Sequence, residues 1–146
     1  MQIIIAPDSR LNQISRKVEI IDDSIISILD QMLKCMYQNN GIGLAAPQVG
    51  ILKRLVVIDC SDNKDIKKPL KLINPEITEL SKNISEFEEG CLSLPSQYAK
   101  VSRPSEITLK YGIDKESPNE LELSNFGIKK PDCLFTVGSG WKNLGK

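Results

Sequence analysis

The sequence predicts an α+β fold in which antiparallel strands pack around an amino-terminal helix. Between residues 23 and 38, apolar side chains recur at the spacing of an amphipathic helix, and Asp22 or Asp23 can cap its start. From Gly41 onward, short apolar segments alternate with turn residues, which is typical of strands. We expect strands at residues 55–59, 70–75, 85–94, 98–102 and 106–111, with a further short one at 121–123. The dipeptide Asn74-Pro75 is expected to end the second strand.

Residues 1–124 form one predicted domain, because no repeat, low-complexity segment or linker interrupts them. The following residues, 125–146, carry no helical pattern and contain glycines at 127, 138, 140 and 145 and a proline at 131. Glycine costs about 1 kcal/mol and proline about 3 kcal/mol inside a helix. We therefore expect a divergent, weakly structured carboxy-terminal tail.

The composition excludes several classes of function. The 19 basic and 19 acidic residues cancel, so no general field attracts nucleic acid or an anionic membrane. No apolar run approaches the ~20 residues that cross a bilayer, and the first residues lack the pattern of a secretory signal. We therefore expect a cytoplasmic protein with no membrane partner and no direct nucleic-acid binding, whose four cysteines are reduced thiols. The chain contains no histidine, so no imidazole exists to bind a metal or carry a proton.

Two segments contain residues that could carry chemistry. The first, residues 41–50, is glycine-rich; such loops are usually ordinary turns, and it lacks the Lys-Ser/Thr pair of a phosphate loop. The second, residues 88–95, contains Cys91, and a lone strand cysteine is more often an inert small hydrophobe than a nucleophile. A cysteine–histidine dyad is excluded, and as a metal ligand Cys91 would need two or three companions.

Together and in this order, the two segments resemble peptide deformylase, which removes the formyl group from the initiator methionine of nascent proteins. Residues 41–48 match the family pattern GxGLAAxQ, and residues 89–93 match EGCxS. Residues 7–11, 55–58 and 73–75 are also similar to the family. The resemblance implies the α+β fold of that family, with antiparallel sheets packed around helices.

The resemblance also implies roles for residues of both motifs. Cys91 corresponds to the thiolate ligand of a divalent metal, iron or zinc, and Gln48 with the Leu92 backbone N–H corresponds to the pair that stabilises the oxyanion. N-formylmethionyl nascent peptides, or the ribosome that presents them, are the implied partners. The residues implied to bind the peptide are Ile42, Gly43, Phe87, Gly90 and Arg103.

The third family signature, HExxH on a carboxy-terminal helix, is absent. It supplies two histidine ligands and a glutamate base, but the matching region, residues 124–133, contains neither a histidine nor a helical pattern. Asp132 and Cys133 are candidate replacement ligands, but Pro131 argues against a rigid helix that would aim them at Cys91. We expect this metal-binding helix to be missing or degenerate, no metal to be bound, and catalysis to be lost.

A frameshift between Tyr111 and Phe126 would explain the abrupt loss of pattern, and the nucleotide sequence downstream tests it. Three alternatives to an inactive deformylase-like protein stay open. The chain could be an active metal-dependent deformylase with non-standard ligands, for instance from another subunit. It could be a non-catalytic module that binds peptide amino termini. It could also be a product without a stable fold.

Overall fold

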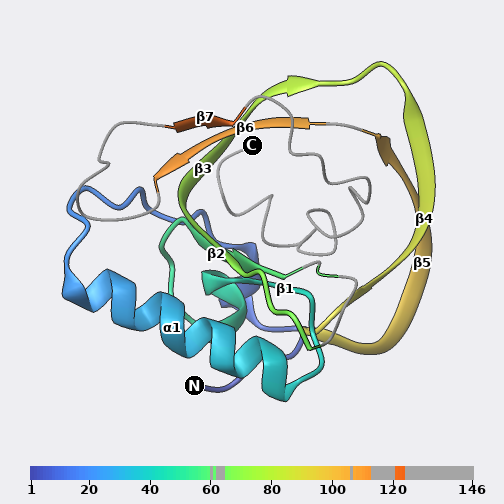
Figure 1. Cartoon of the computed structure of the whole chain (residues 1–146). Helices are drawn as coiled ribbons and strands as arrows, with labels where there is room; N and C mark the ends of the chain where they lie inside the picture. Colours follow the sequence, from blue (N-terminus) through green and yellow to red (C-terminus); the bar gives the residue numbers. More distant parts are fainter. Residues whose placement is uncertain (60, 62–64, 106, 113–120, 124–146) are drawn as a thin grey trace.

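The computed structural model describes residues 1–59, 61, 65–105, 107–112 and 121–123, and the expected tail at 125–146 lies outside them (Figure 1). In chain order the elements are η1 (Ser9–Asn12), α1 (Asp23–Gln38), β1 (Gly43–Ala45), η2 (Ala46–Val49), β2 (Leu55–Ile58), β3 (Leu70–Leu80), β4 (Ile84–Cys91), β5 (Leu94–Pro104), β6 (Ile107–Gly112) and β7 (Leu121–Leu123). Strands β1-β2-β3-β6-β7 form one antiparallel sheet, and β4 and β5 form a separate ribbon. The predicted α+β class is confirmed.

Helix α1 packs mainly against strands β1 and β2 of the five-stranded sheet. It begins where expected, because the Asp22 side chain accepts a hydrogen bond from the Ile25 N–H at 3.1 Å and so caps the first turn. The apolar stripe then buries side chains such as Leu29 and Met36 against Leu44 and Leu55 of the sheet. In Figure 1, α1 lies on one side of the molecule and the β4–β5 ribbon curves along the other. No helix among the described residues is long and apolar enough to span a membrane.

Two predicted strand boundaries are wrong. Asn74-Pro75 does not end β3: Asn74 has a φ of 52°, the register shifts between Ile73 and Glu76, and the strand continues to Leu80. The dipeptide therefore forms a β-bulge, where the missing proline N–H costs no ladder hydrogen bond. The segments expected at 85–94 and 98–102 are one tight hairpin, because β4 ends at Cys91 and β5 begins at Leu94.

The bulge at Asn74 holds a distant part of the chain. Its side-chain Oδ1 accepts from the Val18 N–H at 2.7 Å, and its Nδ2 donates to the Val18 carbonyl at 2.8 Å. Its own N–H donates to the Arg54 carbonyl at 2.8 Å. One amide side chain therefore hydrogen-bonds both the N–H and the carbonyl of Val18. These two bonds hold the segment before α1 against the sheet.

A polar contact joins the end of α1 to the end of β2. The Tyr37 hydroxyl donates to Asp59 Oδ2 at 2.6 Å, and Asp59 Oδ1 accepts from the Ser61 N–H and hydroxyl at 3.0 and 2.7 Å. Burial and the Asp59 hydrogen bond raise the pKa of Tyr37 to about 12. Burial pushes the pKa of Asp59 upward, but the hydrogen bonds from Tyr37 and Ser61 outweigh it and leave that pKa below its usual value. The pair is therefore held as a neutral phenol and a carboxylate.

We expect Asn74→Ala to lower the free energy of unfolding by about 2–3 kcal/mol, because it leaves both Val18 backbone groups without a partner. Asn74→Gly should cost about 1 kcal/mol less than Asn74→Ala, since glycine tolerates the positive φ. Urea denaturation measures both. The control is Asn83→Ala, whose exposed side chain lies at a turn and should change stability by less than about 0.5 kcal/mol. If Asn74→Ala and the unmodified chain have the same free energy of unfolding, the hydrogen bonds from Asn74 to Val18 do not contribute to stability as expected.

We expect Asp59→Asn to lower the pKa of Tyr37 from about 12, because the substitution removes the negative charge that disfavours the phenolate. Ultraviolet titration of tyrosinate absorbance measures this shift. The contribution of Asp59 to stability is present above its unfolded pKa of about 3.9 and is lost as the pH falls through its lower folded value. The contribution of Tyr37 is lost as the pH rises through about 12. If the pKa of Tyr37 is the same in Asp59→Asn as in the unmodified chain, the interaction between Tyr37 and the Asp59 carboxylate is excluded.

Candidate functional site

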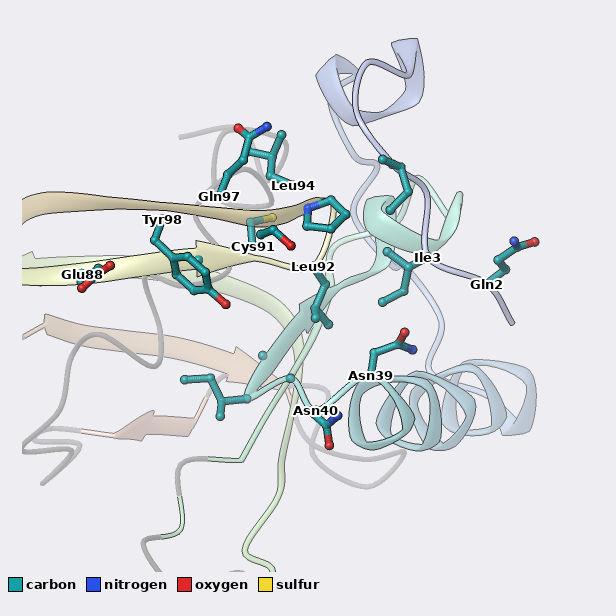
Figure 2. Close-up of a pocket in the computed structure, with 17 residues that line it drawn as sticks. Gln2, Ile3, Asn39, Asn40, Glu88, Cys91, Leu92, Leu94, Gln97 and Tyr98 are labelled. Atoms are coloured by element: carbon teal, nitrogen blue, oxygen red, sulfur yellow. The ribbon is translucent and has the colours of Figure 1, made fainter.

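A cleft of about 750 Å³ opens between three parts of the chain (Figure 2). One wall is the amino-terminal segment at residues 2–5, the second is the connection from α1 to β1, and the third is the β4–β5 hairpin. The amino-terminal wall is held in place by backbone hydrogen bonds from the Ile4 N–H to the Gln48 carbonyl at 2.7 Å and from the Ala6 N–H to the Ser93 carbonyl at 2.9 Å. The cleft is therefore built from segments that are far apart in the sequence.

Gln48 connects the two motifs. Its side chain is 1% exposed, and its Oε1 accepts from the Ala45 N–H at 3.0 Å, which fixes the orientation of the amide. Its Nε2 then donates to Cys91 Sγ and to Ser93 Oγ, both at 3.4 Å. The structure therefore brings the Gln48 amide and the Cys91 thiol, which the resemblance pairs in one site, into contact.

Gly41 allows the hairpin turn to approach the end of α1. A Cβ atom at this position would lie 2.6 Å from Leu92 Cδ1 and 3.4 Å from Met36 Cγ. Glycine permits unusual dihedral angles, but neither Gly41 nor Gly43 has a positive φ, and among the glycines of this segment only Gly50 does, at 80°. The segment is also not a plain turn, since it contains β1 and η2. Gly41 thus places Leu92 and, through it, the neighbouring Cys91.

Strand β1 offers a free edge to the cleft. Ile42 accepts a hydrogen bond from the Asp59 N–H at 2.9 Å, so its backbone carbonyl points toward the β2 side. Backbone groups alternate along a strand, so those of Gly43 point to the other side, where β1 is the outermost strand of the described sheet. Ile42, Gly43 and Gly90 all line the cleft, and their contact with a peptide stays a prediction.

Of the two other residues implied to bind peptide, Arg103 is not among the described residues that line the cleft, and the Phe87 side chain is not described. Arg103 forms a bidentate ion pair with Glu89, with Nε–Oε1 at 2.8 Å and Nη2–Oε2 at 3.0 Å. The Glu89 side chain is only 9% exposed, so this pair is a partly buried contact within the ribbon. Phe87 pairs with Val101 in the ladder, and its side chain lies outside the part that the structure describes. A peptide contact by either residue stays a prediction.

The sequence reasoning missed Glu88 and Tyr98, which also line the cleft. Glu88 and Gly90 lie on the same face of β4, and Tyr98 is the cross-strand partner of Gly90. Because side chains alternate along a strand, the sequence could have predicted that Glu88 lies on the same face of β4 as Gly90. The partner of Gly90, however, depends on the tight turn at residues 92–93, which the predicted boundaries did not contain.

The described side chains do not fit a metal ion. No group of three or more histidine, cysteine, aspartate or glutamate side chains within the described part of the chain could hold one. Cys91 supplies one sulfur, and the whole sequence has no histidine to join it. Asp132 and Cys133, the candidate replacement ligands, lie outside the described residues. Of the two cysteines whose surroundings are described, Cys35 is buried and Cys91 is half-buried.

Comparisons with known proteins agree with the two motifs. The family model for polypeptide deformylase matches residues 1–127. The peptide deformylase of Rhizobium meliloti is 47% identical over 118 residues, which cover 81% of this chain and 67% of that protein. The peptide deformylase of Synechocystis is 45% identical over 113 residues, covering 77% of this chain and 60% of the relative. The chain thus spans about two thirds or less of the length of these curated relatives.

Solved structures give the same answer. A peptide deformylase from Legionella pneumophila superposes with a TM-score of 0.81 at 35% identity, covering 98% of this chain and 80% of the other. A probable peptide deformylase from Synechococcus phage S-SSM7 gives a TM-score of 0.79 at 33% identity, covering 95% of each chain. Motifs, fold and relatives coincide, and the chain belongs to the polypeptide deformylase family.

Proposed function

We propose that this chain is a deformylase-like protein that binds N-formylmethionyl peptides in the cleft and does not hydrolyse them. The observation that carries the proposal is the hydrogen bond from the buried Gln48 amide to Cys91, which lines the cleft. The parts that would hold a peptide are present, whereas the described donor set does not fit the metal on which the family's reaction depends. The ligands would be nascent chains, which makes the cytoplasm the expected compartment.

Peptide binding follows from the free edge of β1. A peptide laid along Gly43 would add a strand to the sheet, and main-chain hydrogen bonds of this kind give affinity without requiring a particular side chain. Gly90 lies on the hairpin wall of the cleft, where the Tyr98 ring packs over it. The formyl oxygen would take the Gln48 Nε2 donor, because the present bonds of that donor to sulfur and hydroxyl are long, at 3.4 Å.

Hydrolysis is not supported by the same residues. Attack on a formyl carbon at neutral pH needs a water made acidic by a metal, and a catalytic metal of this type has three protein ligands. Without that metal, the pKa of water stays far above neutral pH, so hydroxide is scarce. Cys91 has no imidazole beside it to accept its proton, so it is not an activated nucleophile either.

We expect purified protein to contain no stoichiometric iron or zinc and to release formate from a formyl-Met peptide no faster than buffer alone. Elemental analysis and a formate assay measure the two quantities. The Rhizobium meliloti relative, assayed in parallel with added metal, is the positive control. Stoichiometric metal together with turnover would replace this proposal with an active deformylase that uses non-standard ligands.

We expect formyl-Met-Ala-Ser to bind the cleft with measurable affinity by titration calorimetry. N-methylation of its backbone amides in turn should identify one amide whose loss weakens binding about tenfold. A lost backbone hydrogen bond costs about 1 kcal/mol, and the methyl group also obstructs the approach to the edge of β1. The change is made in the peptide, so the fold of the protein is not a variable. Equal affinities for all the methylated peptides would exclude pairing with the strand edge.

A further inference from the structure

The cleft covers the group that an active deformylase has to reach. Gln48 and Ser93 are each 1% exposed, and Cys91 is half-buried. A formyl oxygen that accepts a hydrogen bond from Gln48 Nε2 would therefore lie among shielded residues. Hydrolysis brings a water molecule to the formyl carbon, and the enzyme that does this has to enclose the same end of the peptide. Two proteins cannot enclose one amino terminus at the same time.

The walls of the cleft are held in place by contacts within the chain. The Ile4 N–H donates to the Gln48 carbonyl and the Ala6 N–H to the Ser93 carbonyl, which ties the amino-terminal wall to η2 and to the hairpin turn. Because these bonds are made without a ligand, little ordering of the walls opposes binding. The cleft volume of about 750 Å³ lies in the range of about 300–1,000 Å³ of pockets that bury most of a small ligand. The cleft therefore encloses the first residues of a peptide and leaves the rest outside.

The Gln48 amide distinguishes a formylated terminus from the free amine that hydrolysis leaves. Its Oε1 already accepts from the Ala45 N–H, so it meets a ligand beside Cys91 with the donor Nε2. A formyl oxygen accepts from this donor, whereas an ammonium group has only donors of its own. Glu88 is the one charged side chain among the described residues of the cleft lining, and Figure 2 shows Tyr98 between Glu88 and Cys91 along the ribbon. The cleft therefore favours the substrate of deformylation over its product.

We propose that this chain sequesters formylated amino termini and so withholds them from hydrolysis by an active deformylase. The inference rests on the peptide binding proposed above. When the chain is present at ten times the Kd of the complex, mass action lowers the free peptide concentration about elevenfold. The formyl group of a bound peptide persists until the complex dissociates, and a terminus that has lost the group is released. The protein therefore delays the deformylation of the peptides that it binds.

The test measures formate release from formyl-Met-Ala-Ser by the Rhizobium meliloti relative, with and without an excess of this chain. At peptide concentrations below the KM of the relative, we expect the rate to fall by the same factor as the free peptide, about elevenfold at ten times the Kd. When the peptide exceeds this chain, the rate should recover and kcat should be unchanged. The fractional loss should not depend on the concentration of the relative, because the peptide and not the enzyme is bound.

Titration calorimetry tests the discrimination between substrate and product. We expect formyl-Met-Ala-Ser to bind about tenfold tighter than Met-Ala-Ser, because the amine offers no acceptor to Gln48 Nε2. If the two peptides bind equally, the cleft retains the product as well, and sequestration of formylated termini is overturned.

Variants assign the inhibition to the cleft. Gln48→Ala removes the donor and should abolish most of the inhibition. The matched control is Gln38→Ala, the same change at an exposed residue outside the described cleft lining, which should inhibit like the unmodified chain. Circular dichroism shows whether Gln48→Ala is folded. If it is not, the dependence of the inhibition on the peptide and enzyme concentrations decides the matter.

The outcomes separate this inference from the proposed function. If the peptide binds this chain and the relative still releases formate at an unchanged rate, sequestration is excluded and the peptide-binding proposal stands. If the peptide does not bind, the binding proposal itself fails. Inhibition that remains when the peptide exceeds this chain would show that the chain acts on the enzyme, which also excludes sequestration.

Discussion

The arrangement of the cleft depends on the hydrogen bonds of the buried Gln48 side-chain amide. Its oxygen accepts from the Ala45 N–H, which fixes the amide plane, and its NH2 group then donates to Cys91 and Ser93. A buried amide that lost these partners would cost about 1–3 kcal/mol. The η2 segment and the β4–β5 turn are therefore held together by the Gln48 hydrogen bonds as well as by packing.

The residues that form the cleft differ from those that a catalytic metal would need. The walls of the cleft come from residues 2–5, 39–43 and 88–98, and the contacts that hold them lie within the described part of the chain. Hydrolysis of a formyl group requires different residues, namely a set of protein ligands that bind one metal ion. Under the proposed function, the chain binds a peptide with the first set of residues and does not hydrolyse it, because the described residues do not supply the second set.

The parts of the fold that could be predicted from sequence are those with local causes. The bounds of α1 follow from helical periodicity and the Asp22 cap, and both act within a few residues. Asn74-Pro75 was misassigned as a strand end because its partner is Val18, 56 residues away, and tertiary contacts decided between a turn and a bulge. The pairing of Gly90 with Tyr98 was missed for a related reason, since cross-strand neighbours depend on the register set by the hairpin turn.

The contacts of Cys91 bear on the proposed loss of hydrolysis. A thiol in a cleft needs no counter-ion, because it is neutral when protonated and accepts only weak hydrogen bonds. Here the Gln48 amide supplies one such bond at 3.4 Å. Under the proposed function, selection on the fold would therefore not remove Cys91. The motif EGCxS can outlast the chemistry that it serves in the family, and its presence is evidence of descent and of geometry more than of turnover.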